Sequence, residues 1–345
     1  MNSKQSTRVN EIGLAYSDYR DLPSSLCKGC GHDSITSQII SVAFELSLKP
    51  HEIIRLSGIG CSSKAAAYFF GRSHGFNSLH GRMPSLGTGA LVANHHLSAI
   101  GVSGDGDTAS IGLGQFKHLL RRNLRMVYIV ENNGVFGLTK GQFSATADLG
   151  QELKYAGRNE FPPQDLCMEA IISGCGFVAR SFSGDPQQVR ELLKAALSHR
   201  GTAVLDIISP CVTFNNASDS TKSYKWGKDN AESLQDLHYV PVREEISIEE
   251  FNPGQSRSVE LHDGSQILLQ KLDQNYDPSD RLMAINHLET ARQKGEFITG
   301  LIYINQERPS LTEVLDLVDT PLSLLPEGKL RPSSKALQDI LDSYK

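Results

Sequence analysis

Oxygen-bearing side chains stand at the ends of two predicted strands. Gly104, Asp105 and Gly106 follow one apolar run, and Asn132, Asn133 and Gly134 follow the next. An aspartate and an asparagine, with a backbone carbonyl just after Asn133, would give Mg²⁺ three oxygen ligands, and phosphate and water would complete the octahedron. Asp-Gly and Asn-Gly are also ordinary turn dipeptides. Both occur here, each directly after a strand, which favours a metal and diphosphate site.

A second set of side chains is formed by cysteines. Cys27 and Cys30 form a Cys-x-x-Cys pair, and Cys61 and Cys211 each lie in a loop after a predicted strand. In a reducing compartment, grouped cysteines indicate metal ligation or redox chemistry rather than a disulfide scaffold. Three locations that supply four thiolates suit a [4Fe–4S] cluster. Spacing alone leaves zinc ligation and free thiols as alternatives.

Three other readings of the Cys-x-x-Cys pair fit less well. A thioredoxin-like pair opens a helix after a strand, and no strand is predicted before Cys27. Haem attachment requires histidine directly after the second cysteine, whereas Gly31 stands there before His32. A zinc ribbon requires a second Cys-x-x-Cys, which the sequence lacks. Cys167 and Cys175, on a predicted helix, are expected in the core, because free cysteines are usually buried.

These motifs must be positioned by strands that alternate with helices. Such alternation predicts an α/β fold, with a mostly parallel sheet and helices on both faces. Ligands bind at the carboxyl ends of parallel strands, so four of the strand ends should form one active edge. We predict strands at 52–57, 97–103, 125–130 and 202–208, and helices at 35–48, 113–122, 164–175 and 186–199.

Composition bounds the class of protein. The chain has 345 residues, a formal net charge of −5, 39% hydrophobic residues and 21% charged residues, which is typical of a globular protein. The slight acidity argues against nucleic acid as a partner. No apolar run reaches the roughly 18 residues of a transmembrane helix, so no membrane partner is expected. The polar start lacks the apolar region of a secretory signal, which predicts a cytoplasmic protein.

The chain divides into three predicted regions by composition. Residues 1–26 are polar and predict a surface arm. Residues 27–215 carry the motifs and form the predicted cofactor domain. Residues 216–345 are charged, with scattered apolar pairs, and predict an irregular extension that contacts a partner.

The motifs together resemble the β subunit of 2-oxoacid:ferredoxin oxidoreductases, with the 2-oxoglutarate enzyme as the most similar member. The resemblance covers roughly residues 20–300. It rests on the segments CKGCGH, GIGCSSK, HGFNSLHGRMPSLGTGALVAN, SGDGDTASIGLGQF, VENNGVFGLTKGQFSAT and SPCVTFN.

The resemblance implies a role for individual residues and names three cofactors: thiamine diphosphate, Mg²⁺ and a [4Fe–4S] cluster. Cys27, Cys30, Cys61 and Cys211 match the ligands of the cluster. Asp105, Asn133 and the carbonyl of Val135 match the ligands of Mg²⁺. Contacts to thiamine diphosphate match Ile59, Gly60, Cys61, Ser62, His80, Gly106, Asp107, Gly137 and Leu138, and Lys64 and His80 match residues near the reacting centre.

The resemblance also implies a reaction and partners. It implies oxidative decarboxylation of 2-oxoglutarate with CoA to succinyl-CoA and CO₂, with electrons passed to ferredoxin. Pyruvate or another 2-oxoacid is the alternative substrate. Thiamine enzymes need a glutamate from a second domain, which this chain lacks, so the site should be completed by an α subunit in an αβ or (αβ)₂ enzyme. The contrasting class is a non-catalytic subunit in which zinc holds the four cysteines.

Overall fold

A computed structural model describes most of the chain. The described residues are 8–153, 156–212, 231–233, 256–260, 266–270, 276–294 and 297–345. Much of the predicted C-terminal extension, between 213 and 275, lies outside these residues.

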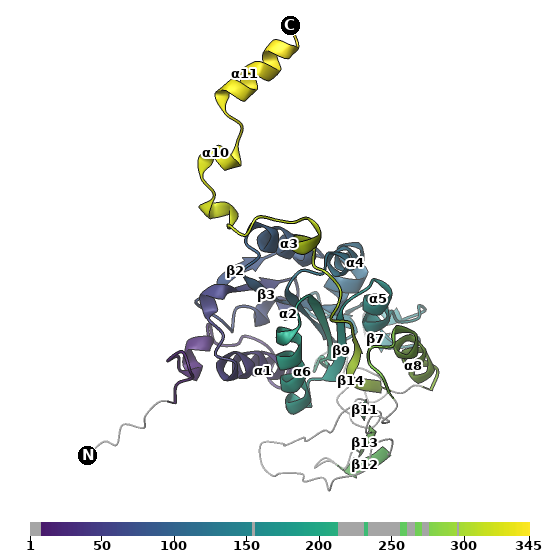
Figure 1. The fold of residues 1–345 in the computed structure, drawn as a ribbon. Coiled ribbons are helices and arrows are strands. Elements are labelled where there is room, and N and C mark those ends of the chain that lie inside the picture. Colours follow the sequence, from purple (N-terminus) through teal and green to yellow (C-terminus); the bar gives the residue numbers. More distant parts are fainter. Residues whose placement is uncertain are drawn as a thin grey trace, which may run out of the picture.

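An eight-stranded sheet forms the centre of the molecule (Figure 1). Its strands run in the order β11-β14-β9-β10-β4-β3-β1-β2. Within this sheet β14 is antiparallel to β9, and the other pairs are parallel. The strands are β1 (Ile53–Ser57), β2 (His74–Asn77), β3 (Ser98–Gly104), β4 (Met126–Asn132), β9 (Phe177–Phe182), β10 (Thr202–Ile208), β11 (Ala231–Ser233) and β14 (Phe297–Ile304). The predicted mostly parallel α/β fold is confirmed.

Helices cover both faces of the sheet, as the sequence predicts. One face packs against α3 (Met83–Ala93), α4 (Leu113–Arg122), α5 (Leu166–Ile172) and α8 (Arg281–Lys294). The other packs against α1 (Gly31–Glu45), α2 (Cys61–Ala65) and α6 (Pro186–Ser198). Cys167 and Cys175 are buried in the first core, as predicted.

The predicted strand ends are close to those observed, with one consequential difference. β10 has the predicted bounds, whereas β4 continues two residues past the predicted end at Val130. The reason is pairing, because β10 extends to Ile208 and its last residues pair with Glu131 and Asn132. Glu131 and Asn132 are therefore buried strand residues rather than loop residues.

The N-terminal segment is more tightly packed than a surface arm. A short turn of helix, η1 (Tyr16–Tyr19), carries the fully buried Tyr19. Its hydroxyl donates to the carbonyl oxygen of Leu48 at 2.7 Å, and its ring packs edge-on against Phe44 and Phe70. One aromatic side chain thus fixes a segment whose composition is otherwise polar.

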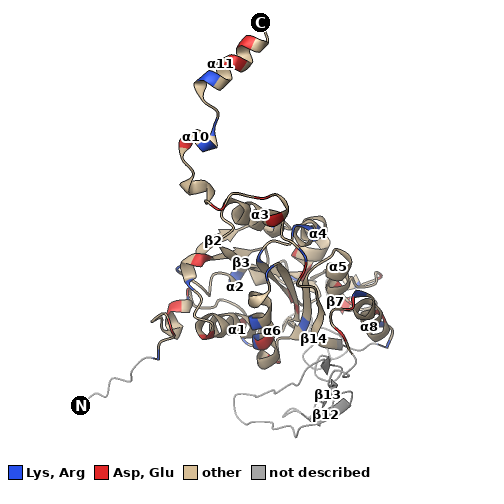
Figure 2. Cartoon of the chain, in the orientation of Figure 1, with Lys and Arg blue, Asp and Glu red and all other residues tan. Residues whose placement is uncertain are grey.

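The C-terminal region contributes to the main body before it leaves it. α8 and β14 join the first core through Leu288 and Ile302. Beyond a bond from His96 to the carbonyl of Asp319, the chain projects away from the sheet (Figure 1). This arm holds α10 (Glu327–Leu330) and α11 (Ser334–Ser343), and both carry charges of both signs (Figure 2). Among the described helices, none has the length and apolar character needed to cross a membrane.

Short elements complete the described chain. They are η2 (Pro50–Glu52), η3 (Gly106–Ile111), β5 (Val135–Phe136), β6 (Gln142–Phe143), β7 (Glu152–Leu153), β8 (Gly157–Arg158), β12 (Ser256–Glu260), β13 (Gln266–Gln270), α9 (Leu311–Val314) and η4 (Leu322–Leu324).

Candidate active site

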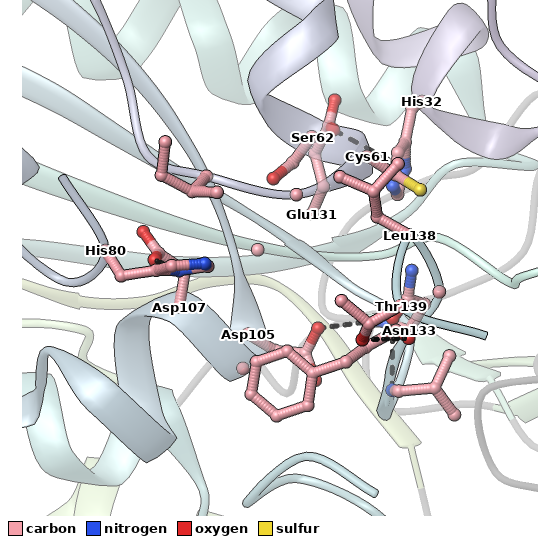
Figure 3. Close-up of a pocket in the computed structure, with 17 residues that line it drawn as sticks. His32, Cys61, Ser62, His80, Asp105, Asp107, Glu131, Asn133, Leu138 and Thr139 are labelled. Atoms are coloured by element: carbon pink, nitrogen blue, oxygen red, sulfur yellow. Dashed lines mark hydrogen bonds and ion pairs between the residues drawn. The ribbon is translucent and has the colours of Figure 1, made fainter. Parts of the chain in front are cut away.

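A cleft lies at the carboxyl ends of β1, β3 and β4 (Figure 3). It holds about 460 Å³, including space open to solvent, which is within the range of small-molecule sites. Its wall includes every predicted contact to thiamine diphosphate and every predicted magnesium ligand. The lining residues are His32, Ile59, Gly60, Cys61, Ser62, His80, Gly104, Asp105, Gly106, Asp107, Glu131, Asn133, Val135, Phe136, Gly137, Leu138 and Thr139.

Asp105 is the most constrained side chain of the cleft. It is 1% exposed. Its Oδ1 accepts from the backbone N–H of Asn133 at 3.2 Å, and its Oδ2 accepts from the N–H of Gly134 at 3.1 Å and from the hydroxyls of Ser144 and Thr146. Three bonds therefore end on Oδ2, which leaves Oδ1 as the oxygen with more room for a cation.

Burial and hydrogen bonding act on Asp105 in opposite directions. Burial raises the pKa of the carboxyl group, and the hydrogen bonds from Ser144, Thr146 and the Asn133 N–H lower it. The net direction is upward. A divalent cation would favour the ionised form, so the donor set and its electrostatics fit Mg²⁺.

A buried polar network is connected to Asp105 through the Thr146 hydroxyl. The hydroxyl of Thr146 also donates to Oδ1 of Asn132 at 2.9 Å, and the amide of Asn132 donates to Asp206 at 3.0 Å. Asp206 accepts from Arg180 at 3.0 Å. The first asparagine of the pair therefore points into the sheet rather than into the cleft, and it connects the predicted metal carboxylate to a buried ion pair.

Asp107 holds His80. Its Oδ1 accepts from the His80 ring Nδ1 at 2.7 Å and from the Gly81 N–H at 2.9 Å, and its Oδ2 accepts from the Ser103 hydroxyl at 3.0 Å. Gly58 leaves room for this arrangement, because a Cβ there would lie 2.2 Å from Oδ2. The carboxyl group is buried, whereas the His80 side chain is 49% exposed and lines the cleft.

Two of the predicted cluster ligands, Cys61 and Cys211, lie beside Gly137. A methyl group on Gly137 would lie 3.6 Å from the Sγ atoms of both Cys61 and Cys211. Burial raises the pKa of Cys61, and the charges of Cys211 and Cys27 raise it further. Burial likewise raises the pKa of Cys30 to about 12, and Cys211 adds to that shift. Geometry thus brings Cys61 and Cys211 together, and the charge of Cys211 also acts on Cys30.

The helix after the Cys-x-x-Cys pair begins earlier than predicted. α1 starts at Gly31, with Cys30 at its N-cap, instead of at residue 35. Gly31 lies tightly against the ends of β9 and β10, since a Cβ there would be 2.4 Å from the Ser183 hydroxyl oxygen and 2.6 Å from that of Ser209. This contact brings Cys30 to the active edge.

The chain is similar to proteins of one enzyme family. Residues 58–207 match the family described as "Thiamine pyrophosphate enzyme, C-terminal TPP binding domain", and residues 268–319 match the C-terminal family of the pyruvate ferredoxin oxidoreductase beta subunit. The 2-oxoglutarate synthase subunit KorB of Methanocaldococcus jannaschii is 32% identical over 246 residues, which cover 69% of this chain and 90% of that subunit. This chain belongs to the 2-oxoacid:ferredoxin oxidoreductase β-subunit family.

Further relatives and one solved structure are also similar to this chain. The β subunit of a 2-oxoacid:ferredoxin oxidoreductase from Saccharolobus solfataricus is 40% identical over 57% of this chain. This chain spans 65% of that relative's length and 51% of the length of the Mycobacterium tuberculosis subunit KorB. A solved 2-oxoglutarate:ferredoxin oxidoreductase from Magnetococcus marinus, with 2-oxoglutarate, coenzyme A and succinyl-CoA bound, is 27% identical, with a TM-score of 0.72 over 95% of this chain and 98% of the other.

Within this family fold, sequence reasoning missed His32, Glu131, Phe136 and Thr139 as cleft residues. Glu131 is fully buried, and neither oxygen makes a hydrogen bond to a described residue. Burial and the charge of Asp33 raise its pKa well above the usual range. The sequence did contain a signal for Glu131. A glutamate at the end of an apolar strand, directly before Asn132, is a charged residue in a segment expected to be buried, which is typical of a functional site.

His32 lies beside Glu131. Its Nδ1 is 2.6 Å from the Ser209 hydroxyl oxygen and 3.5 Å from a Glu131 oxygen. Burial lowers the pKa of His32 to about 4, so the ring is neutral near neutral pH. We refer to the four predicted cluster cysteines, with His32 and Glu131, as the thiol side of the cleft, and to Asp105, Asp107 and Asn133 as its diphosphate side.

Lys64 lies on α2 and is not among the residues that line the cleft. Its charge lowers the pKa of the Cys61 thiol, against the larger effect of burial. The structure therefore places Lys64 near a predicted cluster ligand, and its catalytic role stays a prediction.

Proposed function

We propose that this β-family chain is part of a thiamine diphosphate-dependent enzyme that oxidatively decarboxylates 2-oxoglutarate with CoA, to give succinyl-CoA and CO₂. Electrons would pass through a [4Fe–4S] cluster to ferredoxin. The observation that carries the proposal is a single cleft lined by the oxygen donors Asp105 and Asn133, by the Cys61 thiol and by the loop 135–139. The Cys211 thiol lies against the same loop, at Gly137.

The donor sets fit these groups. Asp105 and Asn133 would hold Mg²⁺ with the Val135 carbonyl, and the cleft offers the buried Ser62 hydroxyl, which has no hydrogen-bond partner among the described residues. Cys27, Cys30, Cys61 and Cys211 would hold the cluster. When bound, thiamine diphosphate supplies an electron sink for decarboxylation, and the adjacent cluster accepts electrons one at a time.

The residues of this chain would have distinct roles in the proposed reaction. Asp105 would orient the metal, because its hydrogen bonds fix the carboxyl group in one position. His80 would face the anionic part of the cofactor. The half-buried Phe136 ring lies over Gly106 and would exclude water from the reacting centre.

The choice of 2-oxoglutarate rests on relatives. The Methanocaldococcus relative is named a 2-oxoglutarate synthase subunit, and the similar solved structure contains 2-oxoglutarate, coenzyme A and succinyl-CoA. Pyruvate or another 2-oxoacid is the alternative, since substrate side-chain contacts can come from the partner subunit.

We also propose an α subunit as the partner. The rim of the cleft exposes apolar side chains, with Leu79 78% exposed and Leu138 51% exposed, and such a surface favours an interface. The C-terminal arm exposes Leu337, Ile340 and Leu341 on α11, at helical spacing that places them on one side. These features support the prediction that the C-terminal extension contacts a partner.

The test is an anaerobic assay of the chain co-purified with its α subunit. We expect 2-oxoglutarate- and CoA-dependent reduction of ferredoxin or a viologen dye, with a slower rate on pyruvate, and no turnover by this chain alone. Absence of thiamine diphosphate binding by the complex would refute the proposal. A faster rate on pyruvate than on 2-oxoglutarate would identify pyruvate as the preferred substrate.

A zinc-stabilised subunit is the alternative of a different class. Four thiolates around one zinc ion lie about 2.3 Å from it, and no group of three or more His, Cys, Asp or Glu side chains in the described part of the chain has an arrangement that could hold a single ion. The choice between zinc and a cluster therefore rests on the metal that the purified protein contains. A brown protein that contains iron and acid-labile sulfide and bleaches with dithionite is expected, whereas a colourless zinc protein would favour the alternative.

A further inference from the structure

One buried hydrogen bond joins two of the three segments that carry the predicted cluster ligands. The ring Nδ1 of His32 lies 2.6 Å from the hydroxyl oxygen of Ser209, although the two residues are 177 positions apart in the chain. Both side chains are buried. His32 follows Cys30 by two residues, and Ser209 precedes Cys211 by two. The bond therefore ties the Cys-x-x-Cys segment to the segment of Cys211.

Ser209 is also held by its backbone. It directly follows β10, and its N–H donates to the carbonyl oxygen of Asn132, the last residue of β4, at 2.7 Å. The residue between Ser209 and Cys211 is the buried Pro210, whose ring fixes its own φ angle. The chain thus has little freedom between the two residues, and the position of Ser209 largely determines that of Cys211.

His32 has an equally direct connection to the other pair of thiols. It lies in the first turn of α1, and Cys30 is the N-cap of that helix. The N–H of Cys30 donates to the carbonyl oxygen of Cys27 at 3.0 Å, which closes the turn between the two cysteines. Because the first turn of a helix and its N-cap move together, fixing the His32 ring also fixes the place of Cys30.

Ser209, rather than the neighbouring carboxyl group, is the partner of the ring. Oε2 of Glu131 lies 3.5 Å from His32 Nδ1, and neither Glu131 oxygen makes a hydrogen bond to a described residue. His32, Glu131 and Cys61 line the same cleft (Figure 3). Thiols that are held in place before a metal arrives lose less conformational entropy when it binds, so the His32–Ser209 bond prepares the thiol side for its ligand.

We propose that the His32–Ser209 hydrogen bond positions Cys30 and Cys211 for the cluster, and that both residues are positioning residues that do not ligate the metal themselves. The inference rests on the proposed function, because it requires a cluster at the four cysteines. Side chains that orient metal ligands by hydrogen bonding typically change metal affinity by about ten- to a hundredfold when they are replaced. The same range is expected here.

The test uses the full chain co-purified anaerobically with its α subunit. Ser209→Ala removes the hydroxyl and His32→Leu removes the ring, and each should shorten the half-time of iron loss to a chelator about tenfold. The electron paramagnetic resonance spectrum of the dithionite-reduced cluster should also broaden, because the thiolates then adopt more than one arrangement. His32→Asn, which retains a polar atom near the position of Nδ1, should keep both properties close to those of the wild type.

Thr202→Val separates this role from a general loss of stability. Thr202 lies at the other end of β10, and its buried hydroxyl donates to the carbonyl oxygen of Leu124 at 2.8 Å. Valine therefore removes one buried hydrogen bond from the same strand, at the end away from Cys211. It should lower the midpoint of thermal unfolding about as much as Ser209→Ala does, yet leave the rate of iron loss and the spectrum unchanged.

The outcomes distinguish this inference from the proposed function. A wild-type complex without iron and acid-labile sulfide would refute the cluster and this inference with it. A wild-type complex with its cluster, and a Ser209→Ala variant with the same rate of iron loss and the same spectrum, would overturn this inference alone. Equal effects of His32→Asn and His32→Leu would also overturn it, because the ring rather than its bond would then matter. Should His32→Leu not fold, Ser209→Ala, which deletes a single oxygen atom, decides the question.

Discussion

The diphosphate side and the thiol side of the cleft are built in different ways. On the diphosphate side, Asp105 and Asp107 accept hydrogen bonds from four and three donors of the chain, respectively. On the thiol side, the oxygens of Glu131 make no hydrogen bond to a described residue. The hydroxyl of Ser183, which lies against Gly31, and one oxygen of Asp185 are likewise without a partner among the described residues.

The difference indicates how each half would acquire its ligand. Buried polar groups cost free energy unless they are paired. The diphosphate side has paired its groups and is preorganised for a small cation. The thiol side combines three cysteine segments with unpaired buried groups, so we expect it to depend on its metal for stability. Substitutions on the thiol side should therefore remove the cluster, whereas those on the diphosphate side should weaken cofactor binding. The largest effect is expected from substitution of a cysteine.

Cys61→Ser should remove the cluster completely. The Sγ atoms of Cys61 and Cys211 would each lie 3.6 Å from a methyl group on Gly137, and the buried thiols of Cys167 and Cys175 belong to the core and cannot substitute for Cys61. Iron and acid-labile sulfide analysis should show the loss. Cys167→Ala is the matched control, because Cys167 is buried in the opposite core and its removal should leave the iron content unchanged. An unchanged iron content in Cys61→Ser would refute the assignment of Cys61 as a cluster ligand.

Asp105→Ala should weaken Mg²⁺-dependent thiamine diphosphate binding at least about a hundredfold, since a metal ligand contributes more than its supporting partners do. It also leaves the buried hydroxyls of Ser144 and Thr146 without their acceptor. Asn133→Ala, which removes a neutral ligand, should cost about tenfold. Calorimetry measures both, and equal affinities in wild type and Asp105→Ala would contradict the metal site.

Asp206→Asn tests whether the network behind Asp105 is structural. The amide would place a donor against Arg180, which keeps only Asp165 at 2.7 Å as a partner among the described side chains. We expect a loss of about 3–5 kcal/mol in the free energy of unfolding, measured by denaturant titration. Cofactor affinity should change only a few-fold, because Asp105 keeps its four donors. A large loss of affinity with unchanged stability would reverse this assignment.

Asp185→Asn tests a buried carboxyl group at the N-cap of α6, whose Oδ2 has no hydrogen-bond partner among the described residues. Burial raises the pKa of Asp185 to about 7, although the Gln188 N–H opposes the shift. The unfolded chain therefore releases its proton at lower pH than the folded chain, and stability falls as the pH rises from about 4 to about 7. Asparagine is an equally good helix N-cap and does not titrate. Relative to Asp185→Asn, the wild type should lose about 3 kcal/mol across this range.

Thermal or denaturant unfolding at a series of pH values gives the measurement. Asp165, the N-cap of α5, is the matched control with the opposite sign: Arg180 holds its pKa below the usual value, so its contribution to stability is lost as the pH falls. A difference between wild type and Asp185→Asn that does not vary with pH would show that Asp185 is already paired.

Local sequence was a good guide to the elements and to the cleft. The apolar run 202–208 and the amphipathic run 113–122 gave the bounds of β10 and α4 as observed. Every predicted contact to thiamine diphosphate lines one cleft, because residues that directly follow parallel strands must meet at one edge of the sheet. The same rule could not find His32, which reaches the cleft only through the packing of α1 on β9 and β10.

What the sequence determined by itself is the set of chemical groups and the edge at which they gather. Strand periodicity fixes that edge, and the spacing of Cys27 and Cys30 fixes one pair of thiols. The direction of each side chain was decided by tertiary structure. Asn132 turns inward because Asp206 lies on the neighbouring strand, and Asp107 turns to His80 because the 80–81 turn lies beside it. Their partners come from distant segments, and only folding brings those donors and acceptors within hydrogen-bond distance.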